Sequence, residues 1–403
     1  MAKQQYTVSI RPLTGVHIGT GKTLTPLDYK IATKIGEVDF KKPMYFKFSS
    51  DKILERLIAE QKDLTAFDRA SVAGNMKELQ KFFNDQCTEI SDTDYPCDVT
   101  ASFIQKYKEN RSKDPLDNSA EVLSMYHTEG SPRPAIPGSS IKGSFRTAIL
   151  NYLLADPNYR KRYDNLLHGY NALLAERNER FLVRNIARYE ATMQKELLEY
   201  NDAKNDPFRC LSIADCTFKA SGTQLTGLLK NISCSKTSGE LSGLDKLQIQ
   251  AEVLRGSLLG GKNVFAEMVI SIDTDLQATR FPKDNKKTMP LSMQEIIESC
   301  NDFYWSAFQE EYDRFYKNSI DSSLRIIHDL KQALDTSRSK TQCIFRVGRW
   351  SQVEFVTFEE NFRKPNTPKG AGNTRTVFDY DGQYVPMGWC VLSVKEPARQ
   401  KFL

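Results

Sequence analysis

The segment IPGSSIKGSFRTAIL, residues 136–150, carries residue types that bind anions at the start of a helix. Gly138 gives the backbone freedom ahead of the predicted helix, and Ser139 or Ser140 is a suitable N-cap. The amides of the first helical turn would then point outward with a partial positive charge. The pattern predicts a phosphate site, although an ordinary capped helix would show the same residues.

Two basic residues follow on the same predicted helix. Lys142 and Arg146 are four positions apart, so they share one helical face and can each reach a phosphate beside the first-turn amides. Gly143 keeps a side chain off that part of the helix, which leaves room for a sugar-phosphate backbone. The alternative is that both cations are simply solvated on an exposed face.

A second segment, TGVHIGTGKT, is rich in glycine and ends like a nucleotide-binding P-loop. The spacing does not fit, because five residues separate Gly15 from Gly21 where GxxxxGK[ST] requires four, and Val16 takes the place of the first glycine. A P-loop enzyme stays an alternative. We expect instead that Gly19, Gly21 and Lys22 let an RNA backbone pass close to the chain.

His17, in the same segment, is a candidate general base. Its sequence neighbours include no partner for such a role, and a lone loop histidine is more often a hydrogen-bonding residue. The other histidines, at positions 127, 168 and 328, are too dispersed for a triad or a metal site.

The tail from residue 341 onward concentrates arginine and lysine around glycine, with two tryptophans that could stack on bases. The predicted RNA contacts there are Arg349, Lys369 and Arg375. The alternative is a surface hairpin whose tryptophans belong to the core, and for Trp389 we favour the core. Trp350 stands where a small residue would be expected after Gly-Arg.

The elements that must position these segments alternate between strand and helix periodicity. Strands are predicted at residues 6–11, 210–218, 247–254 and 265–273, and again in the tail. Helices are predicted within residues 51–83, from about residue 140, in a solvated hairpin at 159–205, and within 291–334. Residues 109–137 are predicted to form an irregular surface connection. The order indicates an α+β fold.

These motifs resemble those of the RAMP superfamily, the RNA-binding proteins of CRISPR effector complexes. PGSSIKGSFRTAIL resembles its signature helix, TGVHIGTGKTLTPLDYKI resembles its first loop, and RCLSIADCTF resembles the following strand with its characteristic Asp215. The resemblance covers about half of the chain. It implies a ferredoxin-like, RRM-type module over residues 1–275, with helical insertions near 50–130 and 157–205, and a strand-rich C-terminal region within 276–403.

Within the superfamily, the length and the LDY motif resemble the subunit that caps the 3′ end of the guide RNA in the type III-A Csm complex. This implies a non-catalytic subunit without a cofactor that binds guide CRISPR RNA and supports its maturation and antiviral defence. The implied partners are the backbone and small subunits, host trimming nucleases and, indirectly, target RNA. The alternative is a metal-dependent ribonuclease subunit using Asp28, because RNA-cleaving backbone subunits carry an aspartate in a comparable loop.

Composition is compatible with this function but does not demand it. The net charge of +5 permits an anionic partner. Eight cysteines without a CxxC pair are expected to be reduced core residues rather than zinc ligands. We expect no membrane segment and no signal peptide, and hence a cytoplasmic protein. A broken basic stripe at residues 160–188 is expected to be a solvated face, with RNA tracking or subunit docking as the alternative.

Overall fold

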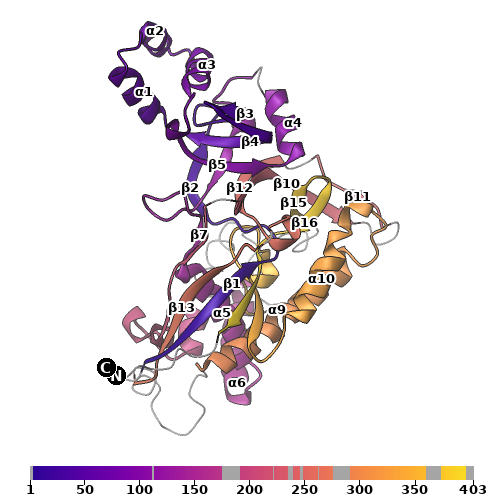
Figure 1. Ribbon diagram of the computed structural model, residues 1–403. Helices are drawn as coiled ribbons and strands as arrows, with labels where there is room; N and C mark the ends of the chain where they lie inside the picture. Colours follow the sequence, from indigo (N-terminus) through magenta and orange to yellow (C-terminus); the bar gives the residue numbers. More distant parts are fainter. Residues whose placement is uncertain are drawn as a thin grey trace.

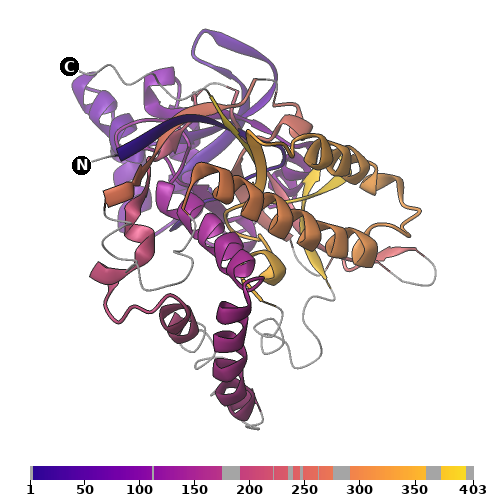
Figure 2. The ribbon, with the colours of Figure 1, turned by 90° about the horizontal axis from the view of Figure 1, so that it is seen from below.

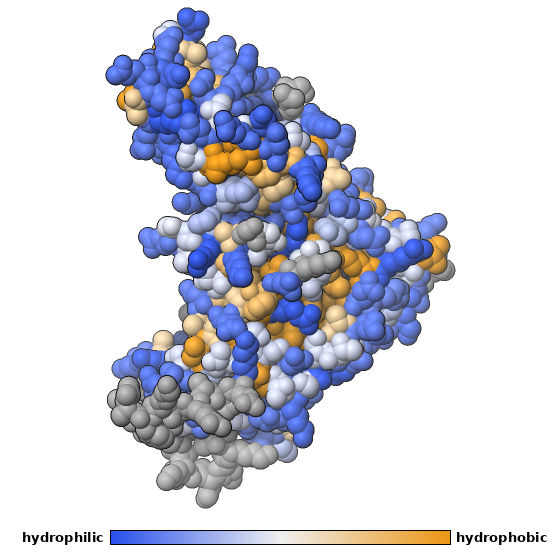
Figure 3. All heavy atoms as spheres, in the orientation of Figure 1, coloured by the Kyte–Doolittle hydropathy of each residue, from blue (hydrophilic) through white to orange (hydrophobic). Residues whose placement is uncertain are grey.

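The computed structural model describes nine stretches of the chain: residues 3–110, 113–174, 191–220, 222–234, 239–245, 248–261, 263–275, 291–359 and 374–395. Helices and strands are mixed along these stretches, and the strands form two large sheets (Figure 1). This confirms the predicted α+β class. Figure 3 shows hydrophilic side chains over most of the end that holds α1–α3, with hydrophobic ones gathered nearer the middle.

The first sheet has the strand order β14-β17-β1-β13-β8, and every pair in it is antiparallel. Its strands are β1 (Lys3–Pro12), β8 (Leu211–Ile213), β13 (Ala266–Asp273), β14 (Gln342–Arg346) and β17 (Trp389–Val394). Val8 and Ile10 of β1 are fully buried two residues apart, as the alternation in the sequence predicts. The sheet joins strands from both sides of residue 275, and a domain division there stays a prediction.

Two long helices, α5 (Gly138–Leu153) and α9 (Met293–Phe315), pack against each other beside this sheet (Figure 2). Phe145 of α5 meets Phe345 of β14 edge to face at 5.6 Å, and the Tyr304 hydroxyl of α9 donates to the Ser144 carbonyl at 3.0 Å. The start of α9 is a capping box, in which Ser292 and Glu295 each accept the other's backbone amide. These contacts hold α5 in place.

The second sheet has ten strands among the described residues, with β2-β6-β12-β10-β5-β4-β3 as its main path. Its strands are β2 (Gly19–Leu24), β3 (Tyr29–Ile35), β4 (Val38–Phe48), β5 (Thr93–Val99), β6 (Val122–Met125), β10 (Gln224–Cys234), β11 (Leu241–Ser242), β12 (Gln248–Leu254), β15 (Arg375–Tyr380) and β16 (Gln383–Pro386). A short separate pair joins β7 (Ala135–Ile136) to β9 (Cys216–Thr217). Residues 109–137 therefore are not wholly irregular, because buried β6 lies inside the sheet.

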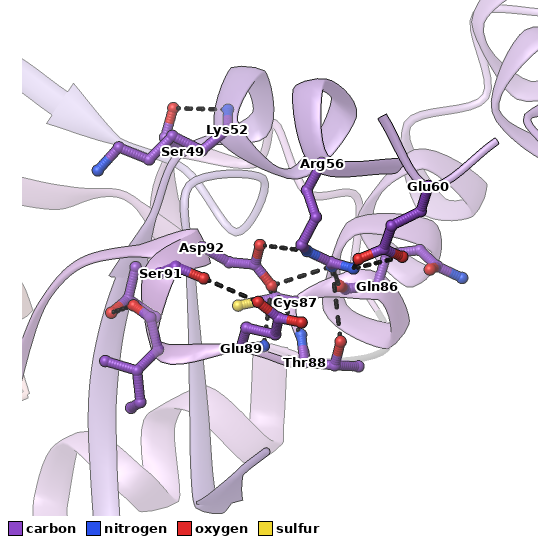
Figure 4. Close-up of polar contacts among 12 residues, drawn as sticks. Ser49, Lys52, Arg56, Glu60, Gln86, Cys87, Thr88, Glu89, Ser91 and Asp92 are labelled. Atoms are coloured by element: carbon purple, nitrogen blue, oxygen red, sulfur yellow. Dashed lines mark hydrogen bonds and ion pairs between the residues drawn. The ribbon is translucent and has the colours of Figure 1, made fainter. Parts of the chain in front are cut away.

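Three helices, α1 (Ser50–Ala59), α2 (Thr65–Val72) and α3 (Met76–Gln86), confirm the predicted helical stretch at 51–83. A buried ion pair ties them to the sheet (Figure 4). Arg56 Nε donates to Asp92 Oδ1 at 2.8 Å, and Arg56 Nη2 donates to the Gln86 carbonyl at 2.6 Å. Asp92, which is 1% exposed, also accepts the amides of Thr88 and Glu89. Because the buried carboxylate has several hydrogen-bond partners, these contacts fix the position of the inserted helices on the sheet.

The remaining helices are α4 (Ala101–Asn110), α6 (Pro157–Leu174) and α10 (Ile326–Thr336), with residues 191–197 also helical. Short 3₁₀ turns lie at Ile90–Asp92, Asn118–Ala120, Ala203–Asn205, Pro207–Cys210, Ser257–Leu259, Ser322–Leu324 and Val353–Phe355. The predicted hairpin at 159–205 and the predicted basic stripe at 160–188 both include residues that lie outside the described ranges. All eight cysteines are free and seven are buried, which confirms that most of them are core residues. No helix in the described ranges is long and apolar enough to cross a membrane.

Candidate nucleic-acid interface

A groove of about 470 Å³ lies where three distant segments of the chain meet. Ile18 comes from the loop that leads into β2, Gly19 is the first residue of β2, and a row of residues comes from α5. Gly348 and Arg349 come from the loop after β14. Each of the three segments carries a motif that the sequence singles out separately, and the fold brings them to one surface. The row on α5 comprises Ser140, Gly143, Ser144 and Thr147.

The loop before β2 is fixed by backbone pairing on both sides. Val16 and Leu254 exchange amide-to-carbonyl hydrogen bonds of 3.0 and 2.8 Å, and the Tyr126 amide donates to the Ile18 carbonyl at 2.7 Å. The Arg349 amide donates to the His17 carbonyl at 2.9 Å, which joins this loop to the tail. These backbone hydrogen bonds therefore hold the loop in place as one wall of the groove.

Gly348 is the residue that allows the two loops to approach. Its φ is +91°, and a Cβ at this position would lie 2.6 Å from the His17 carbonyl oxygen. Both facts require glycine. Trp350 follows with φ +66°, a conformation that side-chain-bearing residues rarely adopt, and its ring centroid lies 5.0 Å from that of His17. The tryptophan that departs from the expected small residue thus packs on the first loop.

His17 supports this wall rather than acting as a base. It is fully buried, and its Nδ1 lies 2.7 Å from the Glu252 carbonyl. Burial lowers the pKa of His17 to about 4, the Glu252 carbonyl opposes that shift, and the charge of Arg349 adds to it. Nε2 has no hydrogen-bond partner among the described residues. A neutral, enclosed imidazole fits a structural role.

The start of α5 differs from the expectation. Its N-cap is Pro137, which has no capping side chain, so the assignment of Ser139 or Ser140 as N-cap is wrong. The cap comes from across the fold, because the Gly138 amide donates to Asp215 Oδ1 at 2.8 Å. A Cβ on Gly138 would lie 2.0 Å from the Ile213 carbonyl oxygen, so this glycine serves the packing of α5 on β8.

Lys142 and Arg146 do share one face of α5, but that face looks onto the chain itself. Lys142 Nζ donates to the Leu211 carbonyl at 2.6 Å, and burial, the largest cause, lowers the pKa of Lys142. Arg146 donates to Gln194 at 3.0 Å, to Asp206 at 2.7 Å and to the Tyr200 hydroxyl at 2.8 Å. Both cations hold the 194–211 segment on α5, and their contact with RNA stays a prediction.

The opposite row of α5 faces the groove. Ser140, Gly143 and Thr147 recur at helical spacing, and a Cβ built on Gly143 would meet no atom within 4 Å. Ser140 and Gly143 were predicted as RNA contacts and Thr147 was not, although the same spacing could have indicated it. Ile18, Val347, Phe355 and Val356 were also missed, because no sequence signal links them.

Gly21 and Lys22 lie in β2, beside the groove-lining Gly19. Gly21 has φ +80° and both residues are exposed. A P-loop ends at the start of a helix, whereas Gly19–Leu24 is a strand, so the fold removes the P-loop alternative. The Lys22 side chain is exposed to solvent.

Asp28 holds a turn between β2 and β3. Its Oδ2 accepts the Thr25 amide at 2.8 Å and the Thr25 hydroxyl at 2.9 Å. Within the described ranges, no group of three or more His, Cys, Asp or Glu side chains could hold a metal ion. The geometry gives Asp28 a local structural role in the chain.

Among the arginines that the structure describes in the tail, one is exposed and two are buried. Arg349 is exposed, and its guanidinium lies 5.0 Å from the Trp350 ring centroid. Arg375, predicted at the RNA surface, is 2% exposed, so that placement is wrong. It pairs with Glu311 at 2.9 Å and Glu354 at 2.7 Å, and the buried Arg346 pairs with Glu311 at 3.1 Å.

Lys369 lies outside the described residues. Trp389 is fully buried among aromatic rings, which confirms the core interpretation. Its ring meets those of Phe355 and Phe308 edge to face at 5.2 and 5.4 Å. The groove can therefore offer a sugar-phosphate chain one exposed guanidinium, the Ser140 hydroxyl, open space over Gly143 and an apolar patch from Ile18 and Val356.

Comparisons with known proteins agree with this geometry. The family model described as the RAMP superfamily matches residues 9–359. One similar solved structure is a chain of a Csm–crRNA–target RNA ternary complex from a type III-A CRISPR–Cas system. It is 17% identical with a TM-score of 0.63, over 98% of this chain and 100% of that chain.

A second similar structure is Csm5 of T. onnurineus, 16% identical with a TM-score of 0.61, over 95% of this chain and 99% of that chain. None of the curated proteins matches the chain. At such identities the likeness is one of fold, and it extends over nearly the whole chain.

Proposed function

The chain belongs to the RAMP superfamily, and on this premise we propose that it binds guide CRISPR RNA as a non-catalytic subunit of a type III-A Csm complex. Its place is the 3′ end of the guide, where it ends the filament of backbone subunits and sets guide length. The backbone and small subunits are its protein partners, and trimming nucleases and target RNA meet it through the assembly. It acts in the cytoplasm in antiviral defence.

One observation carries this proposal: the groove gathers the first glycine loop, the signature helix and the Gly348–Arg349 loop at one surface. These three segments are far apart in the sequence, and the fold brings them together as one open wall of the groove. Two glycines of that wall, Gly19 and Gly143, present backbone rather than side chain. An RNA backbone needs such close approach, and Arg349 at the rim can pair with a phosphate.

The order of elements supports the ferredoxin-like assignment, which we extend to this chain. The strands run β17-β1-β13-β8 across the sheet. In the chain, α5 lies between β1 and β8, and α9 lies between β13 and β17. This order fits the βαββαβ arrangement with insertions, in which two helices cover one four-stranded unit.

A ribonuclease using Asp28 is the second candidate, and the geometry favours it less. The carboxylate already accepts two hydrogen bonds from Thr25, as a turn-forming aspartate does. The matching test is cleavage of bound RNA in the presence of Mg²⁺. Loss of cleavage in Asp28→Asn, with binding retained, would establish the nuclease and overturn the non-catalytic assignment.

RNA binding is tested by fluorescence anisotropy with a short labelled single-stranded RNA. Arg349→Glu reverses the charge at the rim, and Gly143→Glu places a carboxylate in the open space of the groove, where it meets no neighbour. We expect each to weaken binding at least tenfold. The matched controls are Lys340→Glu and Ser71→Glu, which make the same charge changes at exposed positions outside the groove.

The salt dependence adds a second readout. For single-stranded nucleic acid, each phosphate that the protein neutralises contributes about 0.7 to the slope of log affinity against log salt. Arg349→Ala should lower the slope by about that amount, and Lys340→Ala should leave it unchanged. Equal slopes in the two variants would show that Arg349 binds no phosphate.

Capping is tested in the assembled complex by co-expression with a guide locus. The groove variants should leave guides long or heterogeneous, measured by sequencing the RNA that co-purifies. If RNA binding is lost but guide length stays normal, the capping role is overturned while RNA binding stands. If binding survives both groove variants, the groove is not the RNA site.

A further inference from the structure

A second cleft, of about 440 Å³, lies at the open edge of the ten-stranded sheet. β3 is the last strand on the path and pairs only with β4 among the described strands. Lys30, Ile31 and Ala32, three consecutive residues of β3, form one wall of the cleft. Because consecutive side chains of a strand point to opposite faces, a cleft lined by three in a row follows the edge itself.

Two helices flank this edge from opposite faces of the sheet (Figure 1). α3 packs over one face through Phe82 and Phe83, in a cluster with Phe46 and Phe48 of β4. On the other face, Phe103 of α4 packs on the Tyr29–Tyr45 pair, in a separate cluster. The cleft is lined from α3 by Lys77, Gln80, Lys81, Asn84 and Asp85, and from α4 by Tyr107.

The edge offers backbone hydrogen bonds. In an antiparallel pair, alternate residues direct their amide and carbonyl groups away from the partner strand. The pairing of β3 with β4 is regular from Tyr29 to Ala32 and shifts before Lys34, so the regular part coincides with the cleft. An added strand would find its pairing partners there.

The charge of the cleft is positive. Lys30, Lys77 and Lys81 line it against one carboxylate, Asp85, although Lys30 Nζ also donates to the Asn84 and Cys87 carbonyls. Lysines along an edge discourage pairing with neutral strands, because pairing would strip water from the ammonium groups. A strand that carries carboxylates gains ion pairs instead.

The open edge distinguishes two classes of ligand. A peptide supplies an amide donor and a carbonyl acceptor at every residue, whereas a phosphate supplies no donor. A strand with carboxylate side chains would therefore pair with the edge of β3 and place its negative charges beside the lysines of the cleft.

We propose that the open edge of β3 binds an extended acidic segment of a partner protein, which pairs with β3 as an additional strand between α3 and α4. Backbone pairing gives the affinity and the lysines give the selectivity. This site shares no lining residue with the RNA groove, and the inference does not depend on the proposed function.

The test uses the purified full chain and a fluorescein-labelled peptide of alternating Glu and Val residues. A second peptide has the same sequence with alternate amides N-methylated, which removes backbone donors without changing charge. We expect anisotropy to show saturable binding of the first peptide, and at least tenfold weaker binding of the methylated one. Lys77→Glu with Lys81→Glu should weaken the first peptide at least tenfold, whereas the control Lys62→Glu with Lys340→Glu should stay within twofold.

Three results would overturn the proposal. Equal binding of the two peptides would show charge attraction without strand pairing. Absence of saturable binding by the first peptide would show that the edge takes no acidic strand. Binding of oligouridine, lost in the Lys77 and Lys81 variant, together with failure of the peptide, would assign the cleft to RNA.

Discussion

His17 links the rigidity of the groove wall to pH. Its pKa is lowered from 6.5 to about 4 in the folded chain, mainly by burial. Between these values the unfolded chain takes up a proton that the folded chain does not, so stability is lost as pH falls through this window. A shift of this size corresponds to about 3 kcal/mol.

The test is urea unfolding of wild type and His17→Asn at pH 7, 5.5 and 4.5. Asparagine can keep a donor for the Glu252 carbonyl but does not titrate, so the variant should start less stable and lose less stability on acidification. Burial raises the pKa of the Glu252 carboxyl, which acts with the opposite sign, but both proteins retain it. An equal loss in both would show that His17 does not control this window.

Single residues also mark how far the sequence could predict the site. Gly143 and Arg349, predicted as RNA contacts, both line the groove, and their contact with RNA stays a prediction. Arg375 was misplaced, because its partner Glu311 lies far away in the chain. Arg146 is likewise held by Asp206, 60 residues on. The sequence alone does not distinguish an arginine that has an ion-pair partner within the chain from an arginine that is exposed.

Helix α5 contains two glycines whose surroundings differ. At Gly138 an added methyl would collide with the Ile213 carbonyl, whereas at Gly143 it would meet open space. Gly138→Ala should therefore cost about 1–3 kcal/mol of stability through overpacking. Gly143→Ala should gain about 0.5–1 kcal/mol, because alanine loses less conformational freedom in a helix.

Urea unfolding of the two alanine variants measures both effects, with an unchanged m-value as the sign that the transition stays comparable. The pair controls for the substitution itself, since the residue change and the helix are the same. Stabilisation by Gly138→Ala would mean that α5 and β8 are not packed this closely.

Elements with strong periodicity were predictable and short or interrupted ones were not. β1, β12, β13 and the helices of residues 51–83 and 291–334 were identified from their patterns. β6 was missed because four residues inside a charged and proline-rich stretch carry too little pattern. β10, of eleven residues, was missed although it lies inside the sheet, where Gly227 leaves room for the Phe378 ring of β15.

At the scale of the whole molecule, positive charge is concentrated near the N-terminus. Residues 1–48 carry eight basic and three acidic side chains, an excess equal to the net charge of the chain. This stretch supplies Gly19 to the groove beside α5 and Lys30 to the edge cleft. The two sites thus draw on one basic region while they use different helices and different strands.

The two sites should bind independently at physiological salt. They share no lining residue, and at this ionic strength exposed charges are screened beyond about 8 Å. Saturating the chain with the acidic Glu–Val peptide should leave its affinity for single-stranded RNA within twofold. By linkage, saturating RNA should leave the peptide affinity equally unchanged.

A tenfold change in both affinities would show instead that the two sites are coupled. In that case β2 and β3, joined by the Thr25–Asp28 turn, would move together when either ligand binds. Asp28→Ala, which removes the acceptor of that turn, would then abolish the coupling while each ligand still bound alone.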